Sequence, residues 1–289
     1  MTYPIVLAHG IARFDVLARE LVDDGAAAED ATHYFRGIRS TLRNAGFRAH
    51  HSNVPWAESV SNRAEALKSN VECIRRREDC SKVHVIAHSM GGLDARHMLF
   101  EHQRDRMHEK VASVTTIGTP HLGTSFADWG VEHASELLAM LEVFEIDKLD
   151  GFRDLTTKAC LTFDEDARDF ERSCGVLFQT FAGTQALPYV FAPLQLPWFI
   201  ITEADRRFDG GANDGLVPLY SQKWRDEYFR RRFDADHLNE IGWWDSNELG
   251  LRFFPSAQKV LSSIKQLEKQ IRGLYLEIAR ELAERFPDE

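Results

Sequence analysis

The sequence predicts an α/β fold with a mostly parallel central sheet flanked by helices. Short apolar runs, of the length of buried strands, alternate along the chain with segments of helical periodicity. Such alternation is typical of parallel strands that are connected by helices. The expected strands are 4–8, 46–50, 82–88, 113–118, 177–182 and 228–233, and the expected helices are 33–45, 60–78, 92–107 and one from 256 onward.

The length and composition favour one folded domain. The chain has 289 residues, 44% of them hydrophobic, and no repeat or Gly/Ser-rich linker divides it. We expect a single domain over residues 1–289, with a lid or cap insertion at about 125–176 and a further apolar segment at about 186–201. That segment contains three prolines and is too short to be a transmembrane segment. The formal net charge of −10 disfavours nucleic acid or an anionic membrane as a partner.

Ser89 is the first candidate catalytic residue. It lies between an expected strand and an expected helix, in Lys82-Val-His-Val-Ile-Ala-His-Ser-Met-Gly-Gly-Leu-Asp94. Ala87, Gly91 and Gly92 are small, as they must be where the backbones of a strand and a helix approach closely. This is the setting of a nucleophile elbow, although the pattern is A-x-S-x-G rather than the commoner G-x-S-x-G. A strand-to-helix turn that merely contains a serine is the alternative.

The order of residues along the chain then predicts the catalytic base and acid. In hydrolases with such an elbow, the serine is followed by an acid and then by a histidine. Eleven of the twelve histidines lie at or before His133, which leaves His237 as the expected base. Asp214 is the preferred acid, because it follows an expected strand and Leu216-Val217 can anchor its loop. On order alone, four other acids compete with it: Asp205, Asp209, Asp234 and Asp236.

Two backbone amides are expected to form the oxyanion hole. One is the N–H of Met90, the residue after the nucleophile. The other is the N–H of Ile11, since the apolar run that begins at Pro4 ends in His9-Gly10 and the chain turns there. Because both donors are main-chain groups, the chemistry places little demand on either side chain.

A candidate lid lies between Ala134 and Ile146, where apolar residues recur at helical spacing. One interpretation is that these side chains simply pack on the core. The other is a lid and acyl-binding wall, in which Leu137, Leu141 and Phe144 contact the substrate.

Five motifs occur in order and together resemble one family. They are Tyr3-Pro-Ile-Val-Leu-Ala-His-Gly10, Val83-His-Val-Ile-Ala-His-Ser-Met-Gly-Gly92, Ile117-Gly-Thr-Pro-His-Leu-Gly-Thr124, Asn213-Asp-Gly-Leu-Val217 and Asp236-His-Leu-Asn-Glu240. From about residue 3 to about residue 241 the chain resembles the bacterial true lipases of the pseudomonad and Proteus type. The resemblance implies an α/β-hydrolase fold and hydrolysis of carboxylic esters, often acylglycerols. Position by position, it implies Ser89, Asp214 and His237 as the catalytic triad and Ile11 and Met90 as oxyanion donors.

The sequence also departs from that family. Ala87 stands where those lipases usually have glycine. They commonly hold a structural Ca²⁺ near the catalytic histidine, and the corresponding ligand positions here are Asn239 and Trp243, which disfavours a tight calcium site. Asp205 and Asp209 are alternative acidic partners for such an ion. We expect no required cofactor and no metal in the chemistry.

The four cysteines leave two alternatives open. Cys73 and Cys80 are close in sequence, as are Cys160 and Cys174, so two local disulfides can be drawn. Alternatively, Cys73 points from its helix into the core. The family's disulfide near the acid cannot form, because no cysteine lies beyond Cys174.

The function expected from these residues is that of a serine carboxylic-ester hydrolase, in the first place a lipase acting on lipid or small esters at a lipid–water interface. A short-chain carboxylesterase or an acyltransferase would use the same triad, and an inactive hydrolase fold would be a binding protein. Tyr3 already belongs to the first expected strand, so the sequence as it stands has no signal peptide and suggests a cytoplasmic protein. The resembled enzymes are often secreted, and the location and the oligomeric state stay open.

Overall fold

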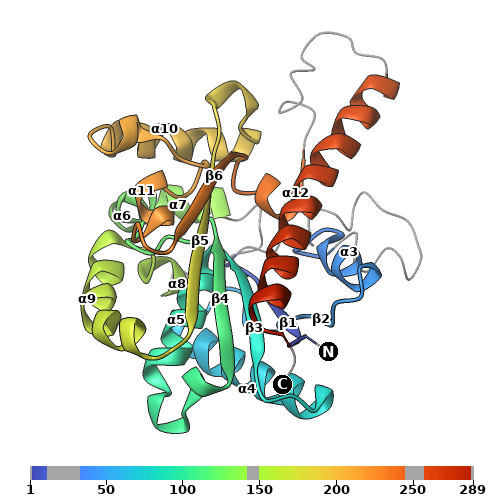
Figure 1. The fold of residues 1–289 in the computed structure, drawn as a ribbon. Coiled ribbons are helices and arrows are strands. Elements are labelled where there is room, and N and C mark those ends of the chain that lie inside the picture. Colours follow the sequence, from blue (N-terminus) through green and yellow to red (C-terminus); the bar gives the residue numbers. More distant parts are fainter. Residues whose placement is uncertain (1, 12–32, 142–149, 245–256, 288–289) are drawn as a thin grey trace.

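The computed structural model describes residues 2–11, 33–141, 150–244 and 257–287. Within these ranges the chain forms a six-stranded sheet in the order β2-β1-β3-β4-β5-β6, and every neighbouring pair is parallel (Figure 1). The strands are β1 (Ile5–Ala8), β2 (Ala49–His51), β3 (Val83–His88), β4 (Val111–Ile117), β5 (Leu177–Thr184) and β6 (Phe229–Asp234). The predicted parallel α/β architecture is therefore confirmed, and each strand lies within a few residues of its predicted position.

Helices and short 3₁₀ turns connect the strands. The α-helices are α3 (Ile38–Asn44), α4 (Val60–Glu78), α5 (Met90–Glu101), α6 (Ser125–Glu132), α7 (Ala134–Leu141), α8 (Asp150–Arg153), α9 (Thr157–Ser173), α10 (Gln195–Ala204), α11 (Leu219–Lys223) and α12 (Ala257–Arg285). The 3₁₀ turns are η1 (Gln103–Asp105), η2 (Met107–Glu109), η4 (Leu187–Tyr189), η5 (Ala192–Leu194), η6 (Asp209–Gly211) and η7 (Asn239–Ile241). Among the described residues no helix is both long enough and apolar enough to cross a bilayer.

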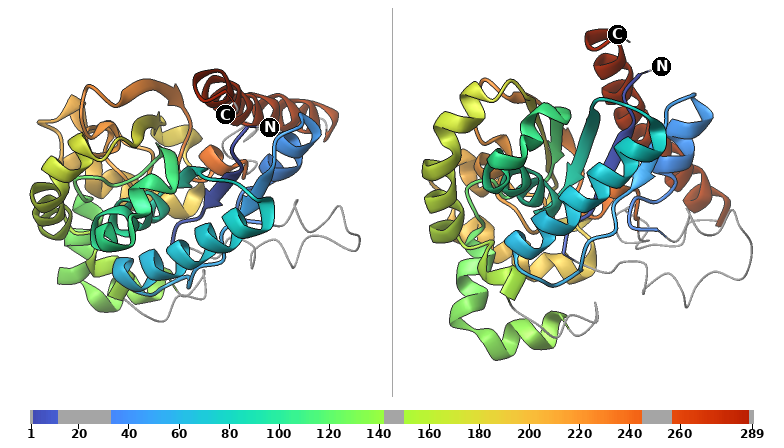
Figure 2. Two further views of the ribbon diagram at one scale, coloured as in Figure 1. Left: turned by 60° about the horizontal axis from the view of Figure 1, so that its bottom comes forward. Right: turned by 90° about the horizontal axis from the view of Figure 1, so that it is seen from below.

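Both faces of the sheet are covered, which explains why the central strands are apolar at nearly every position. Ile5 and Leu7 of β1 pack in a cluster with α3 and α12, whereas Val6 and Ala8 pack in a second cluster with α4 and α5. This alternation follows from the two-residue period of a strand. Figure 2 shows the long helix α12 beside α3 and away from α4 and α5. Every residue of β3 and β4 is buried, as is usual for strands inside a parallel sheet.

A third cluster lies beyond the carboxyl ends of the strands. It joins the beginnings of α4 and α5 to α6, α7, α8, α9 and α10, through buried apolar side chains that include Val60, Met90, Phe126, Phe152 and Ile201. The region predicted as a lid or cap insertion thus contains α6 to α9, and the further apolar segment forms η4, η5 and most of α10. The apolar residues at helical spacing predicted α7, whereas α6, α8, α9 and α10 were not predicted individually.

The cysteines are all free thiols in the structure. Cys73 is exposed, so the expectation that it points into the core is wrong. The buried face of α4 is formed by Val60, Ala64, Leu67, Val71 and Ile74, and Cys73 lies on another side of the helix. Cys160, in contrast, is buried in the third cluster.

Candidate active site

Ser89 occupies a strained turn between β3 and α5. Its φ and ψ are 57° and −135°, a positive φ that a residue with a side chain rarely adopts. Its backbone N–H donates to the carbonyl oxygen of Ile117 (3.0 Å), and its carbonyl oxygen accepts from Gly92 N (3.0 Å) and Thr119 Oγ1 (2.8 Å). The surrounding backbone therefore fixes this conformation. It is the strand–turn–helix geometry expected of a nucleophile elbow.

Glycines beside Ser89 allow the close approach of three segments. A Cβ at Gly91 would collide with the carbonyl oxygen of Ala8, and one at Gly92 would collide with the side chain of Thr119. A Cβ at Gly10 would lie 2.7 Å from the Cβ of Ser89. The loop after β1 consequently packs directly against Ser89. Ala87, in place of the usual glycine, is fully buried in the sheet.

Arg63 holds the loop after β1 in place. Its Nη2 donates to the carbonyl oxygens of His9 (2.7 Å) and Gly10 (3.3 Å), and His9 Nδ1 donates to the Gly10 oxygen as well (2.9 Å). The C=O and N–H of a trans peptide point in opposite directions. With the Gly10 carbonyl directed at Arg63, the N–H of Ile11 is directed away from it. The N–H of Met90 lies in the first turn of α5, where amides have no partner within the helix.

The Arg63 guanidinium is fully buried and paired with Asp94. Its Nε and Nη2 contact both carboxylate oxygens of Asp94 at 2.7 to 3.1 Å. Burial raises the pKa of Asp94 to about 6 although the charge of Arg63 opposes that change. Sequence analysis did not find Arg63, since an arginine in a helix ordinarily faces solvent.

His237 and Asp214 meet although they come from different loops. His237 Nδ1 donates to Asp214 Oδ2 at 2.8 Å, and both side chains are buried. The backbone N–H of His237 donates to the carbonyl oxygen of Asp214 (2.8 Å), which ties the two loops together. The other carboxylate oxygen, Oδ1, accepts from the amides of Leu216 (2.8 Å) and Val217 (2.7 Å). With Nδ1 facing the carboxylate, Nε2 is the imidazole nitrogen that can accept a proton.

The competing acids have other partners. Asp205 accepts from a serine hydroxyl of α6 (2.6 Å), and Asp209 faces a lysine of α11 (3.3 Å). Asp236 accepts from two amides of its own loop (2.9 Å each), and Asp234 is exposed at the end of β6. Among these five acids, Asp214 is the one whose hydrogen bond to the imidazole the structure describes.

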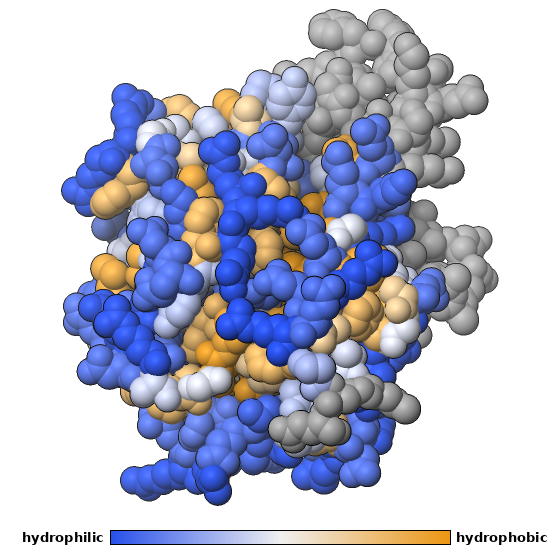
Figure 3. All heavy atoms as spheres, in the orientation of Figure 1, coloured by the Kyte–Doolittle hydropathy of each residue, from blue (hydrophilic) through white to orange (hydrophobic). Residues whose placement is uncertain are grey.

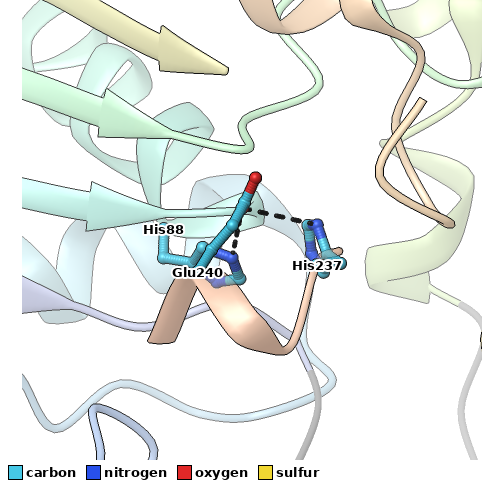
Figure 4. Close-up of side chains that lie close together, drawn as sticks. All are labelled: His88, His237 and Glu240. Atoms are coloured by element: carbon cyan, nitrogen blue, oxygen red, sulfur yellow. Dashed lines mark hydrogen bonds and ion pairs between the residues drawn. The ribbon is translucent and has the colours of Figure 1, made fainter. Parts of the chain in front are cut away.

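The His237 ring also contacts the residue before Ser89. The ring of His237 lies 4.5 Å from the ring of His88, the residue immediately before Ser89. His88 Nε2 is 2.9 Å from Glu240 Oε2, and that oxygen is 3.9 Å from His237 Nδ1 (Figure 4). Figure 4 shows the side chains converging from the end of β3 and from the loop after β6. Sequence analysis did not assign a role to His88 or Glu240.

His88, His237 and Glu240 offer ligand atoms within 4.8 Å of one another, the spacing of a metal site. Two of the nitrogens already have hydrogen-bond partners, however, because Nδ1 of His237 faces Asp214 and Nε2 of His88 faces Glu240. A metal ion bound there would displace the hydrogen bond between His237 and Asp214. The cluster is better described as part of the same hydrogen-bonded site.

The calcium positions implied by the resemblance do not fit calcium. Asn239 Oδ1 accepts from the amide of Asp236 (3.1 Å), and its Nδ2 donates to the carbonyl oxygen of Trp243 (3.0 Å). Trp243 Nε1 donates to the carbonyl oxygen of Tyr34 (3.0 Å). Both side chains stabilise the loop directly, and an indole offers no oxygen ligand.

The candidate lid residues are only partly described. Leu137 is fully buried and packs in the third cluster, where its Cδ2 would lie 2.7 Å from a Cβ at Gly130. The side chain of Leu141 and the whole of Phe144 lie outside the described residues. Leu137 is thus a core residue on the buried side of α7.

Comparisons with known proteins agree on the class of protein. Residues 56–147 match the family model described as a PGAP1-like alpha/beta domain. The chain is 29% identical to triacylglycerol lipase 2 of Saccharomyces cerevisiae, over 83% of this chain and 80% of the relative. It is 34% identical to a triacylglycerol lipase of Vibrio cholerae, over 83% of this chain and 79% of the relative.

Solved structures agree on the fold. The metagenomic carboxyl esterase MGS0156 superposes with a TM-score of 0.68 at 17% identity, over 98% of this chain and 76% of that chain. The parallel sheet, the strained serine turn and the two lipase relatives lead to one conclusion. The chain belongs to the α/β-hydrolase lipase family and is a lipase-type carboxylic-ester hydrolase.

Proposed function

We propose that Ser89 is the nucleophile, His237 the general base and Asp214 the residue that orients the base. The observation that carries the assignment is the 2.8 Å hydrogen bond between His237 Nδ1 and Asp214, in a loop whose imidazole contacts the residue before a strained, buried serine. Asp214 fixes the tautomer in which Nε2 accepts a proton and stabilises the imidazolium that forms.

The reaction then proceeds in two halves. His237 Nε2 takes the proton of Ser89 Oγ as this oxygen attacks the ester carbonyl carbon, and the carbonyl oxygen becomes an oxyanion. The N–H groups of Ile11 and Met90 donate to that oxyanion. As the intermediate collapses, the C–O bond to the alcohol breaks and His237 returns the proton to the departing alcohol. Water, deprotonated by His237, attacks the acyl-enzyme in the same way and releases the carboxylic acid.

Every group in this scheme is supplied by the chain, so we propose that neither a cofactor nor calcium is required. Activity is expected to be unchanged by EDTA in calcium-free buffer. A loss that added Ca²⁺ restores would contradict this.

We propose that the substrates are lipid esters, acylglycerols among them. We also propose that the protein is related to the pseudomonad and Proteus type of lipase. The names of the two relatives and the five ordered motifs support this. The test is a series of p-nitrophenyl esters from acetate to palmitate, with Ser89→Ala as control. Rates should peak at long acyl chains, and Ser89→Ala should lose at least ~10³-fold in kcat. A peak at acetate or butyrate would instead indicate a short-chain carboxylesterase.

An apolar surface beside the site supports contact with a lipid–water interface. Residues 186–202 contain no charged residue, and large side chains there are exposed: Leu187, Tyr189, Leu196 (52%) and Phe199 (54%). Figure 3 shows apolar groups among polar ones where Figure 1 places α10. This segment adjoins the acid loop, because a Cβ at Gly215 would lie 3.0 Å from Leu194 Cβ. An uncharged surface suits a neutral lipid better than an anionic one.

The interfacial role of α10 can be tested separately from the chemistry. Leu196→Ser with Phe199→Ser should lower turnover of an emulsified triacylglycerol while hydrolysis of soluble p-nitrophenyl butyrate stays unchanged. Leu161→Ser is the matched control, since Leu161 is similarly exposed (47%) but belongs to α9. Equal losses for both kinds of variant would argue against a specific role of α10.

A further inference from the structure

Behind the catalytic residues, a chain of buried polar side chains connects the histidine loop with the oxyanion loop. Glu240 Oε2 lies 2.9 Å from His88 Nε2, and His88 Nδ1 lies 2.7 Å from Tyr34 Oη. Tyr34 in turn reaches the loop after β1, because a Cβ at Gly10 would lie 2.6 Å from its hydroxyl oxygen. The side chains of Glu240, His88 and Tyr34 are at most 1% exposed.

The fold makes specific room for the Glu240 carboxyl group. A Cβ at Gly118 would collide with Oε2, and one at Gly183 would collide with Oε1. Gly118 also has a φ of 60°, a conformation that favours glycine. Glu240 also has a backbone contact that does not involve its carboxyl group, since its carbonyl oxygen accepts from Tyr275 Oη (3.1 Å). The carboxyl group therefore has a fixed position between the ends of β4 and β5 and the ring of His88.

We propose that Glu240, His88 and Tyr34 form an uncharged hydrogen-bond relay that positions the oxyanion loop relative to the catalytic histidine, with Glu240 as the proton donor to His88. The relay rests on the proposed roles of Ser89, His237 and Ile11. Its members are positioning residues, because none of them needs to touch the substrate.

The charge states fit a relay of neutral groups. Burial, reinforced by the charges of Asp214 and Asp236, raises the pKa of Glu240 well above its usual value. Burial and the neighbouring His237 lower the pKa of His88, and burial raises the pKa of Tyr34. The groups that face Glu240 are His88, His237, Asp214, Asp236, Tyr34 and Tyr275. Among the residues that the structure describes, none of these groups is a permanent cation, and the burial of Glu240 outweighs the Gly183 backbone hydrogen bond that favours its ionised form.

The direction of each hydrogen bond follows. A protonated Oε2 donates to His88 Nε2, which makes Nδ1–H of the same ring the donor to the oxygen of Tyr34. Glutamine can replace the acid as donor through its amide N–H, but alanine cannot. Phenylalanine at position 34 keeps the ring and removes the oxygen that links His88 to Gly10.

The test compares Glu240→Gln, Glu240→Ala and Tyr34→Phe. Tyr275→Phe is the matched control, because it removes a hydroxyl that is bonded to the backbone of Glu240 and not to its carboxyl group. The readouts are kcat and KM for a soluble p-nitrophenyl ester, the pH profile of kcat/KM, and the affinity for an alkylboronic acid, whose tetrahedral adduct with the serine mimics the oxyanion. Thermal unfolding identifies variants that fail to fold.

Glu240→Gln and Tyr275→Phe should stay within about threefold of the wild type with an unchanged pH profile. Tyr34→Phe, and Glu240→Ala if it folds, should lose roughly 10-fold to 100-fold in kcat and in boronate affinity with little change in KM. The relay is refuted if Glu240→Gln loses as much as Tyr34→Phe or moves the acidic limb of the profile, because Glu240 would then act as a carboxylate. It is equally refuted if Tyr34→Phe binds the boronate like Tyr275→Phe. Turnover by Ser89→Ala would refute the proposed function itself, whatever the relay variants do.

Discussion

The guanidinium of Arg63 donates a 2.7 Å hydrogen bond to the carbonyl oxygen of His9 and thereby joins α4 to the loop after β1. The same group neutralises Asp94 in a fully buried position. We therefore expect Arg63 to contribute both to stability and to the orientation of the Ile11 amide, and suitable variants can separate the two contributions.

Arg63→Met is expected to lower the free energy of unfolding by about 3–5 kcal/mol, because it leaves the Asp94 charge buried without a partner. Adding Asp94→Leu should recover much of that stability, since no charge is then buried. The double variant should nevertheless lose at least about tenfold in kcat, because the carbonyl oxygens of His9 and Gly10 have lost their hydrogen bonds to the guanidinium. Urea denaturation and ester hydrolysis measure the two effects, and a double variant with normal kcat would contradict the positioning role.

Asp214→Asn is expected to lower kcat by on the order of 10³-fold or more with little change in KM, since the amide no longer fixes the required tautomer of His237. Asp205→Asn is the control, because Asp205 follows the nucleophile in sequence as well but accepts its hydrogen bond from Ser125. Steady-state kinetics on a soluble ester suffice. Comparable losses in both variants would mean that the acid has been assigned wrongly.

Two glycine-to-alanine substitutions should have opposite effects on stability. At Gly91 the new methyl group would collide with the carbonyl oxygen of Ala8, so both stability and activity should fall. At Gly273, inside α12, a Cβ meets nothing within 4 Å, and alanine should stabilise the helix by about 0.5–1 kcal/mol. Thermal unfolding of the two variants is the measurement. A stabilised Gly91→Ala would show that the elbow is less crowded than described.

His84 should make the stability depend on pH. Burial lowers the pKa of this imidazole to about 4, and its Nδ1 lies 2.8 Å from Ser113 Oγ. Between about pH 6.5 and 4 the unfolded chain binds a proton here that the folded protein does not, so the free energy of unfolding falls as the pH falls, by about 3 kcal/mol at most. Other buried histidines add to the same trend.

The contribution of His84 is therefore measured as a difference. Urea denaturation between pH 4.5 and 7 should give a shallower pH dependence for His84→Asn than for the wild type. His133→Gln, which changes an exposed histidine, should keep the wild-type slope. Identical slopes in all three proteins would refute the assignment.

The sequence predicts much of this site because chain order is informative for a parallel α/β fold. The six strands have clear apolar runs, and Ser89, Asp214 and His237 each follow one of them. The Asp214 loop could be ranked above its competitors because Leu216 and Val217 offered an anchor, and their amides do bind the carboxylate.

Arg63 and Glu240 could not be predicted in the same way. Each is an ordinary charged residue in the sequence, and its role arises only from burial and from partners 31 and 152 residues away. The same limit applies to Cys73, since one face of α4 carries the apolar residues and a single cysteine does not reveal its direction. The environments of Arg63, Glu240 and Cys73 are all determined by tertiary packing, which leaves no signal in the neighbouring sequence.

The backbone of Ser89 has a consequence for any attempt to make this enzyme more heat-resistant. A positive φ at a residue with a side chain stores on the order of 1–3 kcal/mol, and glycine would release part of it. Ser89→Gly should therefore melt at a higher temperature than the wild type and be inert. At this position a gain in thermal stability removes catalytic activity, so stabilising substitutions have to be made elsewhere in the molecule.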